Sequence, residues 1–240
     1  MLLILICCIS FTSISYSNTK IGLMVYDPPF VISPQEGFDV DLSHLLCKQL
    51  KLNCQFVFIK DSHQLYEALK NGQVDLAISG ITISAEGRDD FIFSLPYMLS
   101  KGQFLTLRQS NINSLNDLKG KTIGIIKDKL SGGVLYAYIN KHFPEQFKIK
   151  QYGSIENMFS DLSNKSIAAV FLYRSDANYW NHNGSNLFKI IGPVVTLGEG
   201  MGIASAPKNA DLIAQINKVL QQMEQDNTYL NLYKTYFSNQ

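Results

Sequence analysis

The chain of 240 residues has almost no net charge, few cysteines and few histidines. Its 21 basic and 20 acidic side chains leave a net charge of +1, so no overall field attracts nucleic acid or an anionic membrane. The four histidines lack the spacing of metal ligands, and the chain has no Gly-x-Ser-x-Gly, His-Glu-x-x-His or phosphate-loop motif. We therefore expect no cofactor, no metal and no nucleic-acid partner. The length allows one large domain or two compact lobes.

Residues 1–17 differ in composition from the rest of the chain. They are largely apolar, contain Cys7 and Cys8, and carry no charge; the first charged side chain is Lys20. Small residues at Ser15 and Ser17 fit a cleavage before Asn18, so the pattern predicts a secretory signal peptide and a periplasmic protein. The basic residues that usually precede the apolar core are missing, and acylation of a cysteine is the alternative. The apolar run is too short for a comfortable transmembrane span.

Cleavage would leave two cysteines, Cys47 and Cys54, with six residues between them. In an exported chain such a pair favours a disulfide, here between the end of a predicted helix and the start of a predicted strand. The bridge would contribute about 2 kcal/mol. A pair of reduced core thiols is the alternative, and the lack of a second ligand pair argues against zinc.

Predicted strands and helices alternate along the chain, which indicates an α/β fold. The apolar runs predict strands at 21–25, 56–59, 74–78, 104–107, 122–126, 168–172 and 194–197. Helices are predicted at 63–71, closed by a glycine, and in a long segment after Pro207 with apolar residues at helical spacing.

The stretch 37–47 combines a turn glycine, an aromatic ring and two acids with an apolar stripe. The four leucines at 42, 45, 46 and 50 form one face of a helix. Asp39 and Asp41 fall where that helix should begin, where carboxylates can accept free backbone N–H groups and meet the positive end of the helix dipole. This string resembles the signature of the family 3 extracellular solute-binding proteins, which capture polar amino acids for ABC transporters.

The resemblance covers nearly the whole mature chain and implies an α/β, two-lobed periplasmic-binding-protein fold of type II. Two hinge strands would join the lobes, and a ligand cleft would lie between them and close like a Venus flytrap. The expected division is 1–17 signal peptide, 18–107 first part of lobe 1, 108–197 lobe 2, and 198–240 return to lobe 1. Cysteines at the spacing found here occur in some basic-amino-acid receptors of this family.

In the resembled family, a Gly/Ser-Ile/Met-Thr segment and a following arginine grip the ligand carboxylate. The matching segment is 79–88, where Arg88 would supply a planar fork of donors and Thr82 a hydroxyl. Arg88 stands eight residues after Gly80, where the family usually has seven. An arginine solvated in a loop and paired with a neighbouring aspartate is the alternative. The predicted ligand contacts in this segment are Ser79, Gly80, Ile81, Thr82 and Arg88.

Three further segments are expected to reach the ligand. Tyr26 and Asp27 lie in the entry loop, where Asp27 would pair with a cationic group or instead form an Asx turn. After the strand at 122–126, Lys129 would supply charge and Ser131 would cap the next helix and contact the ligand. Tyr173 stands where many amino-acid receptors have an aspartate for the ligand ammonium.

A tyrosine hydroxyl brings no charge, which leaves the ammonium partner open. Either Asp27 or Glu199 takes over this role, or the ligand has no ammonium group; Asp176 comes three residues late.

The sequence thus predicts a monomeric periplasmic binding protein that captures an amino acid, with one similar to arginine or lysine as the candidate, for the inner-membrane permease of an ABC transporter. It would not be an enzyme. The alternative is an enzyme on the same scaffold, similar to periplasmic cyclohexadienyl dehydratases, with Asp27 or Glu199 as the acid.

Overall fold

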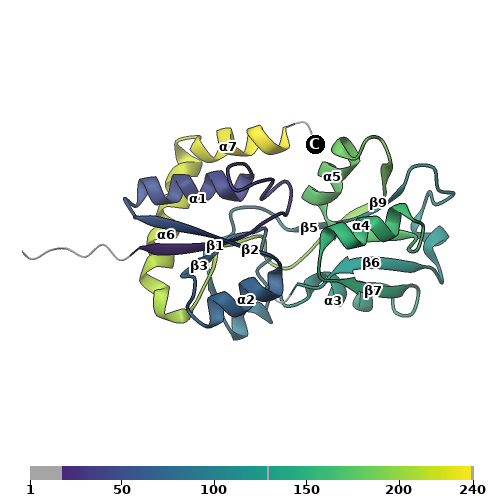
Figure 1. The fold of residues 1–240 in the computed structure, drawn as a ribbon, viewed down its shortest axis with the longest axis horizontal. Helices are drawn as coiled ribbons and strands as arrows, with labels where there is room; N and C mark the ends of the chain where they lie inside the picture. The colour runs from purple at the N-terminus through teal and green to yellow at the C-terminus, as the bar shows by residue number, and fades with distance from the viewer. Residues whose placement is uncertain (1–17, 129, 239–240) are drawn as a thin grey trace, which may run out of the picture.

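The computed structural model describes residues 18–128 and 130–238, and it folds them into two α/β lobes that lie side by side (Figure 1). Each lobe is built around its own five-stranded sheet. The two-lobed fold predicted from the sequence is confirmed. The expected signal peptide and Lys129 lie outside the described residues.

The first lobe has the strand order β2-β1-β3-β10-β4. Strand β1 runs parallel to β2 and β3, whereas β10 is antiparallel to β3 and β4. The strands of this lobe are β1 (Thr19–Met24), β2 (Cys54–Ile59), β3 (Leu76–Ala77), β4 (Ile92–Phe93) and β10 (Ala204–Ser205). Its helices are α1 (Phe38–Gln49), α2 (Ser62–Lys70), α6 (Ala210–Gln225), α7 (Thr228–Phe237) and the short 3-10 turns η1 (Gly87–Asp89) and η3 (Pro207–Asn209).

The second lobe has the strand order β7-β6-β8-β5-β9. Strand β6 runs parallel to β7 and β8, and β5 is antiparallel to β8 and β9. Its elements are β5 (Lys101–Leu107), η2 (Leu115–Leu118), β6 (Thr122–Ile126), α3 (Val134–His142), β7 (Lys148–Tyr152), α4 (Ile155–Ser163), β8 (Ala169–Tyr173), α5 (Arg174–Asn183) and β9 (Phe188–Thr196).

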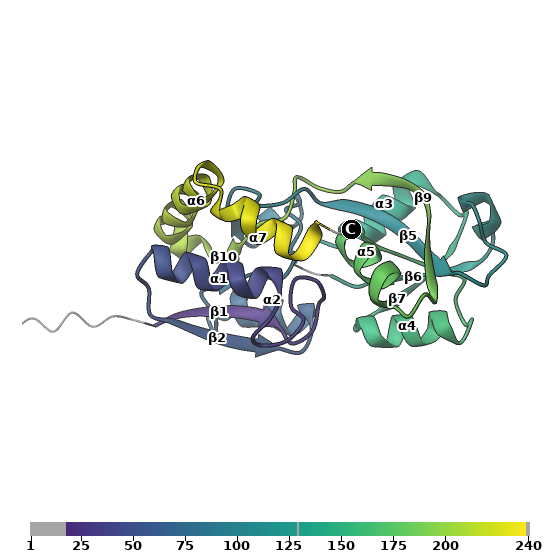
Figure 2. The same cartoon turned by 90° about the horizontal axis from the view of Figure 1, so that it is seen from above.

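The boundary between the lobes differs from the one expected at residue 107. Strand β5 pairs along its length with β9 and over its first half with β8, so it belongs to the second sheet and the crossing lies before Lys101. The sequence shows that β5 is apolar but not which sheet it joins. The two crossing segments, 94–100 and 197–203, bind each other: the Tyr97 amide donates to the Met201 carbonyl, and the Met201 amide donates to the Met98 carbonyl. Figure 2 shows both running along one side of the molecule.

Helix α1 begins without the carboxylate caps expected from the sequence. Gly37 is the N-cap residue, and a Cβ atom there would lie 2.2 Å from the Phe30 carbonyl oxygen, so the tight approach requires glycine. Asp39 faces the interior instead, and Asp41 accepts a hydrogen bond from the Tyr236 hydroxyl at 2.7 Å.

The return segment packs on the first lobe through aromatic rings. The Phe38 ring of α1 lies between 5.2 and 6.5 Å, centroid to centroid, from five other rings: Phe30, Tyr97, Tyr229, Tyr236 and Phe237. Helices α6 and α7 thus complete the core that β1 and α1 begin. The predicted Cys47–Cys54 disulfide is present and joins α1 to β2. Among the described helices, none has the length and apolar content needed to cross a membrane.

Candidate functional site

A cleft of about 280 Å³ lies between the lobes. Its walls come from the segments that follow β1, β2 and β3 in the first lobe and β6, β7 and β8 in the second. These strands are parallel within each sheet, so their carboxyl ends share one edge, and the two edges face each other across the cleft. Ligands of open α/β sheets bind at such edges.

The first-lobe wall contains five of the residues predicted from the sequence: Tyr26, Asp27, Ser79, Gly80 and Ile81. The Ser79 hydroxyl accepts a hydrogen bond from the Met24 amide at 2.9 Å, which joins the segment after β3 to the end of β1. Gly80 has a φ of +56°, and a Cβ atom there would lie 2.8 Å from the Phe30 ring. Glycine is therefore required for the backbone to pass this ring.

Asp39 fixes the position of the Gly80 backbone from behind the cleft. Its Oδ2 accepts hydrogen bonds from the Gly80 amide at 2.7 Å and from the Tyr97 hydroxyl at 3.1 Å. Burial raises the pKa of the Asp39 carboxyl to about 7, against the lowering effect of these two donors. Asp39 therefore acts on the site by positioning, a role that the sequence-based prediction of a helix cap missed.

The second-lobe wall contains Tyr173 and three acids, Asp128, Glu156 and Asp176. Asp176 lies in the first turn of α5 and accepts a hydrogen bond from the Ser175 hydroxyl at 3.0 Å. Asp128 follows β6 and accepts from the Ser131 amide at 3.2 Å. Asp128 and Glu156 are not among the residues predicted from the sequence, and Asp176 follows the expected acidic position by three residues. The feature that could have identified these three acids is their position, because each comes within four residues after the carboxyl end of a strand in the second sheet.

Asp27, Asp128 and Asp176 are poor at holding their charge in the absence of a ligand. Burial raises the pKa of Asp176 to about 7. Burial and the neighbouring Asp176 carboxyl raise the pKa of Asp27 well above its ordinary value, and burial also raises the pKa of Asp128. Among the described residues that line the cleft, the only cation is Lys60, which is exposed. The cleft is therefore suited to a positively charged group, which would favour the ionised carboxylates.

Nothing in the described part of the chain forms a cluster of three or more metal-ligating side chains.

Arg88, the residue predicted to grip a carboxylate, is not among the residues that line the cleft. Its guanidinium forms an ion pair with Glu199 at 2.8 Å, and its side chain is 46% exposed. The preceding residue, Gly87, packs against the second lobe, where a Cβ atom would lie 2.9 Å from the Leu130 carbonyl oxygen. Arg88 lies in η1, and its partner Glu199 belongs to the crossing segment 197–203.

Thr82 and Ser131 also differ from their expected role, because they bind each other and line no part of the cleft. The Thr82 amide donates to the Ser131 hydroxyl at 2.9 Å, and both residues are buried. A second bond between the lobes joins the Ser62 hydroxyl to the Lys127 carbonyl at 3.1 Å. These bonds hold the lobes together in the arrangement that encloses the cleft.

Replacing Ser131 with alanine should weaken this closed arrangement. The variant leaves the Thr82 amide without its partner whenever the lobes close, which costs about 1 kcal/mol. We expect ligand affinity to fall about fivefold, with little change in thermal stability of the ligand-free protein, as measured by calorimetric titration and melting curves. Ser163→Ala, at an exposed position on α4, is the matched control. Unchanged affinity in Ser131→Ala would mean that this bond does not contribute to closure.

Known proteins similar to this chain give independent evidence about its family and its fold. The family model that describes the bacterial extracellular solute-binding proteins, family 3, matches residues 20–239 of this chain. The chain is 30% identical over 216 residues to the arginine-binding periplasmic protein of Mannheimia haemolytica, covering 86% of this chain and 85% of that protein. It is 32% identical over 206 residues to the ABC transporter arginine-binding protein 1 of Escherichia coli K12, covering 84% and 81%.

A solved structure gives the same result for the fold. An arginine 3rd transport system periplasmic binding protein from Legionella pneumophila superposes with a TM-score of 0.85 at 37% identity, covering 92% of this chain and 99% of that one.

Proposed function

Because the chain belongs to family 3 of the bacterial extracellular solute-binding proteins, we propose that it captures a basic amino acid such as arginine and presents it to the permease of an ABC importer. The observation that carries this is the set of acids in the cleft, the buried Asp176 and the half-buried Asp27 and Asp128, which lack a buried cationic partner among the described lining residues. The names of the two curated relatives and of the solved structure, all arginine-related, support the same ligand class.

In this proposal the cationic end of the ligand lies among these three acids of the cleft. Tyr26 and Tyr173 flank it, and the backbone of 79–81 binds the remaining polar atoms. Arg88 takes no part, since Glu199 already holds it at the surface. Lys129 follows Asp128 directly in the sequence and stays the predicted source of a positive charge for the ligand carboxylate.

Capture is reversible binding with closure of the lobes. The two relatives are named as arginine-binding proteins, one of them of an ABC transporter, which favours this function over the dehydratase alternative. Export to the periplasm by cleavage after residue 17, and action as a monomer, belong to the same proposal.

A thermal-shift screen of the mature chain, from residue 18, against the twenty amino acids tests the ligand class. Arginine, lysine or histidine should raise the melting temperature by mass action, while glutamate and aspartate should leave it unchanged. A shift with acidic amino acids alone would contradict the proposed ligand, and turnover of prephenate or arogenate would indicate the enzyme.

Affinity for the cation should fall as the pH is lowered through about 7. The pKa of Asp176 lies near 7 in the ligand-free cleft, so below that pH the carboxyl must lose a proton before it pairs with the ligand. For each proton that the cleft must release on binding, the affinity falls by up to about tenfold for every unit by which the pH is lowered. Calorimetric titration at pH 8, 7, 6 and 5 measures the slope; an affinity that stays constant over this range would show that no carboxyl of the cleft changes its protonation on binding.

A further inference from the structure

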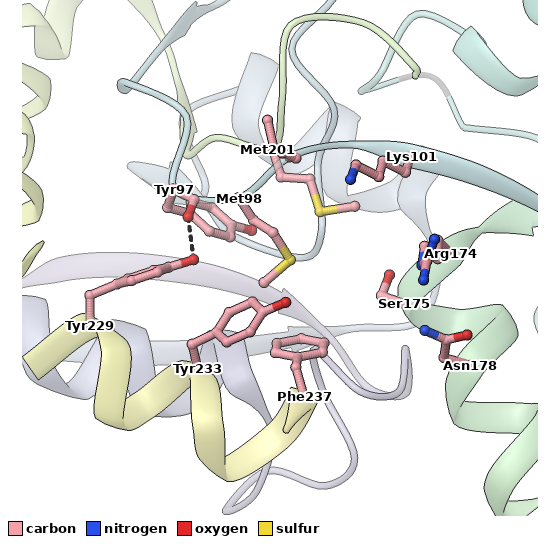
Figure 3. A pocket seen from close by; sticks show the side chains of 11 residues that line it. Tyr97, Met98, Lys101, Arg174, Ser175, Asn178, Met201, Tyr229, Tyr233 and Phe237 are labelled. Atoms are coloured by element: carbon pink, nitrogen blue, oxygen red, sulfur yellow. Dashed lines mark hydrogen bonds between the residues drawn. The ribbon is translucent and has the colours of Figure 1, made fainter. Parts of the chain in front are cut away.

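A second cavity, of about 450 Å³, lies between helices α5 and α7 beside the crossing segments (Figure 3). We call it the α5–α7 pocket. It shares no lining residue with the ligand cleft, and its walls come from both lobes. Its lining residues from the second lobe are Lys101, Arg174, Ser175 and Asn178, and Figure 3 shows all four on one side of the pocket.

The second-lobe wall carries two positive charges and no negative one. Gly102 of β5 is the ladder partner of Tyr173 in β8, so the adjacent residues Lys101 and Arg174 extend from neighbouring points of the backbone. Within the described part of the chain, neither side chain has an acidic partner or a side-chain hydrogen bond, and the pocket lining contains no aspartate or glutamate. Two like charges side by side repel each other unless an anion lies between them.

The opposite wall is apolar and aromatic. Tyr233 and Phe237 of α7 lie with their ring centroids 4.9 Å apart, and the Met98 side chain lies beside them in Figure 3. Tyr233 is 37% exposed and Leu99, at the edge of the pocket, is 70% exposed. Such a surface binds an aromatic ring or an acyl chain by apolar contact.

We propose that the α5–α7 pocket binds a small amphipathic anion, a carboxylate, sulfonate or phosphate with an aromatic or acyl body. The head group binds Lys101 and Arg174, and the apolar body packs on Tyr233 and Phe237. The volume lies in the range of small-molecule sites, about 300–1,000 Å³. Because the cations belong to one lobe and the rings to the other, the bound anion bridges the lobes and stabilises the arrangement seen here.

Bridging the lobes links this site to the ligand cleft. Any molecule that binds one arrangement of the lobes better than another shifts the equilibrium between them, and the effect is reciprocal. The α5–α7 pocket is thus a second site through which an anion would change the affinity of the cleft for its own ligand. Anion binding itself does not depend on which ligand the cleft takes.

The probe 8-anilinonaphthalene-1-sulfonate combines an anionic head with an aromatic body and tests the site by fluorescence titration of the folded mature chain. We expect saturable binding of one molecule per chain. Lys101→Gln and Arg174→Gln should each weaken binding about tenfold, the value of one charge-assisted hydrogen bond of about 1.5 kcal/mol. The double variant should bind at least about fiftyfold more weakly.

The matched control is Lys141→Gln/Lys148→Gln, which removes two exposed charges of the same lobe and should bind the probe as the wild type does. Melting curves establish that every variant is folded. Benzoate should displace the probe at concentrations where inorganic phosphate does not; equal displacement by phosphate would overturn the amphipathic class of the ligand. No probe binding, or equal binding by the Lys101→Gln/Arg174→Gln variant and the control, would overturn the site.

Discussion

Replacing Asp176 with asparagine is expected to weaken the binding of arginine by roughly a hundredfold, because it removes one carboxylate from the partners of a buried cation. Asparagine has nearly the same shape and still offers an oxygen to the Ser175 hydroxyl, so the wall of the cleft is preserved. Calorimetric titration at pH 8 measures the loss.

The same substitution should stabilise the ligand-free protein. Burial raises the pKa of Asp176 to about 7, against an ordinary value near 4, so its contribution to stability is fully present below about pH 4 and is lost as the pH rises through 7. The asparagine variant should therefore melt at a higher temperature than the wild type at pH 8, and at the same temperature at pH 4.

Asp211→Asn removes the same charge from an exposed position on α6 and serves as the control for both measurements. Undiminished arginine affinity in Asp176→Asn would remove this acid from the ligand site, whatever the change in melting temperature.

Replacing Phe38 with alanine is expected to destabilise the protein by about 4 kcal/mol. The ring is fully buried and contacts aromatic rings from the entry loop, from a crossing segment and from α7. Its loss leaves a cavity where the first part of the chain meets the return segment. For a chain of this length, the melting temperature should fall by about 10 °C.

Chemical denaturation with urea measures the free energy of unfolding of Phe38→Ala. Tyr136→Ala, which removes an aromatic ring that is 41% exposed on α3, should cost less than about 1 kcal/mol. A similar small cost for Phe38→Ala would show that α7 does not depend on this ring for its attachment to the first lobe.

Local patterns in the sequence were sufficient for β1, α1, β2, α2 and α6 of the first lobe and for β5, β6 and β8 of the second sheet, whereas β4, β7 and β10 were not predicted. The leucine stripe from Leu42 predicts α1, and the apolar run at 122–126 coincides with β6. Helix α5 was missed because its sequence is polar throughout, with only Asp176 and Ala177 buried, so it has no apolar stripe. The predicted strand at 74–78 is reduced to two paired residues in β3.

The site was only partly predictable, for a physical reason. Tyr26, Asp27 and 79–81 lie in the segments that follow predicted strands, and they do line the cleft. Asp128, Glu156 and Asp176 are far apart in the sequence and meet only because three parallel strands end at one edge of the second sheet.

The position of Arg88 could not be obtained from spacing alone. A difference of one residue puts Gly87, instead of an arginine, against the Leu130 carbonyl, and Arg88 turns to Glu199. The position of Arg88 thus follows from the contact of Gly87 with the opposite lobe, and local sequence patterns contain no information about that contact.

Titration of the wild-type mature chain with L-arginine and with L-citrulline is the most direct test of a positive charge in the acidic cleft. The two molecules have closely similar shapes, but citrulline carries a neutral urea group where arginine carries a guanidinium. We predict that arginine binds at least about a hundredfold more tightly at pH 8, through Asp27, Asp128 and Asp176. Equal affinity for the two, with measurable binding of both, would contradict a cleft that selects its ligand by charge.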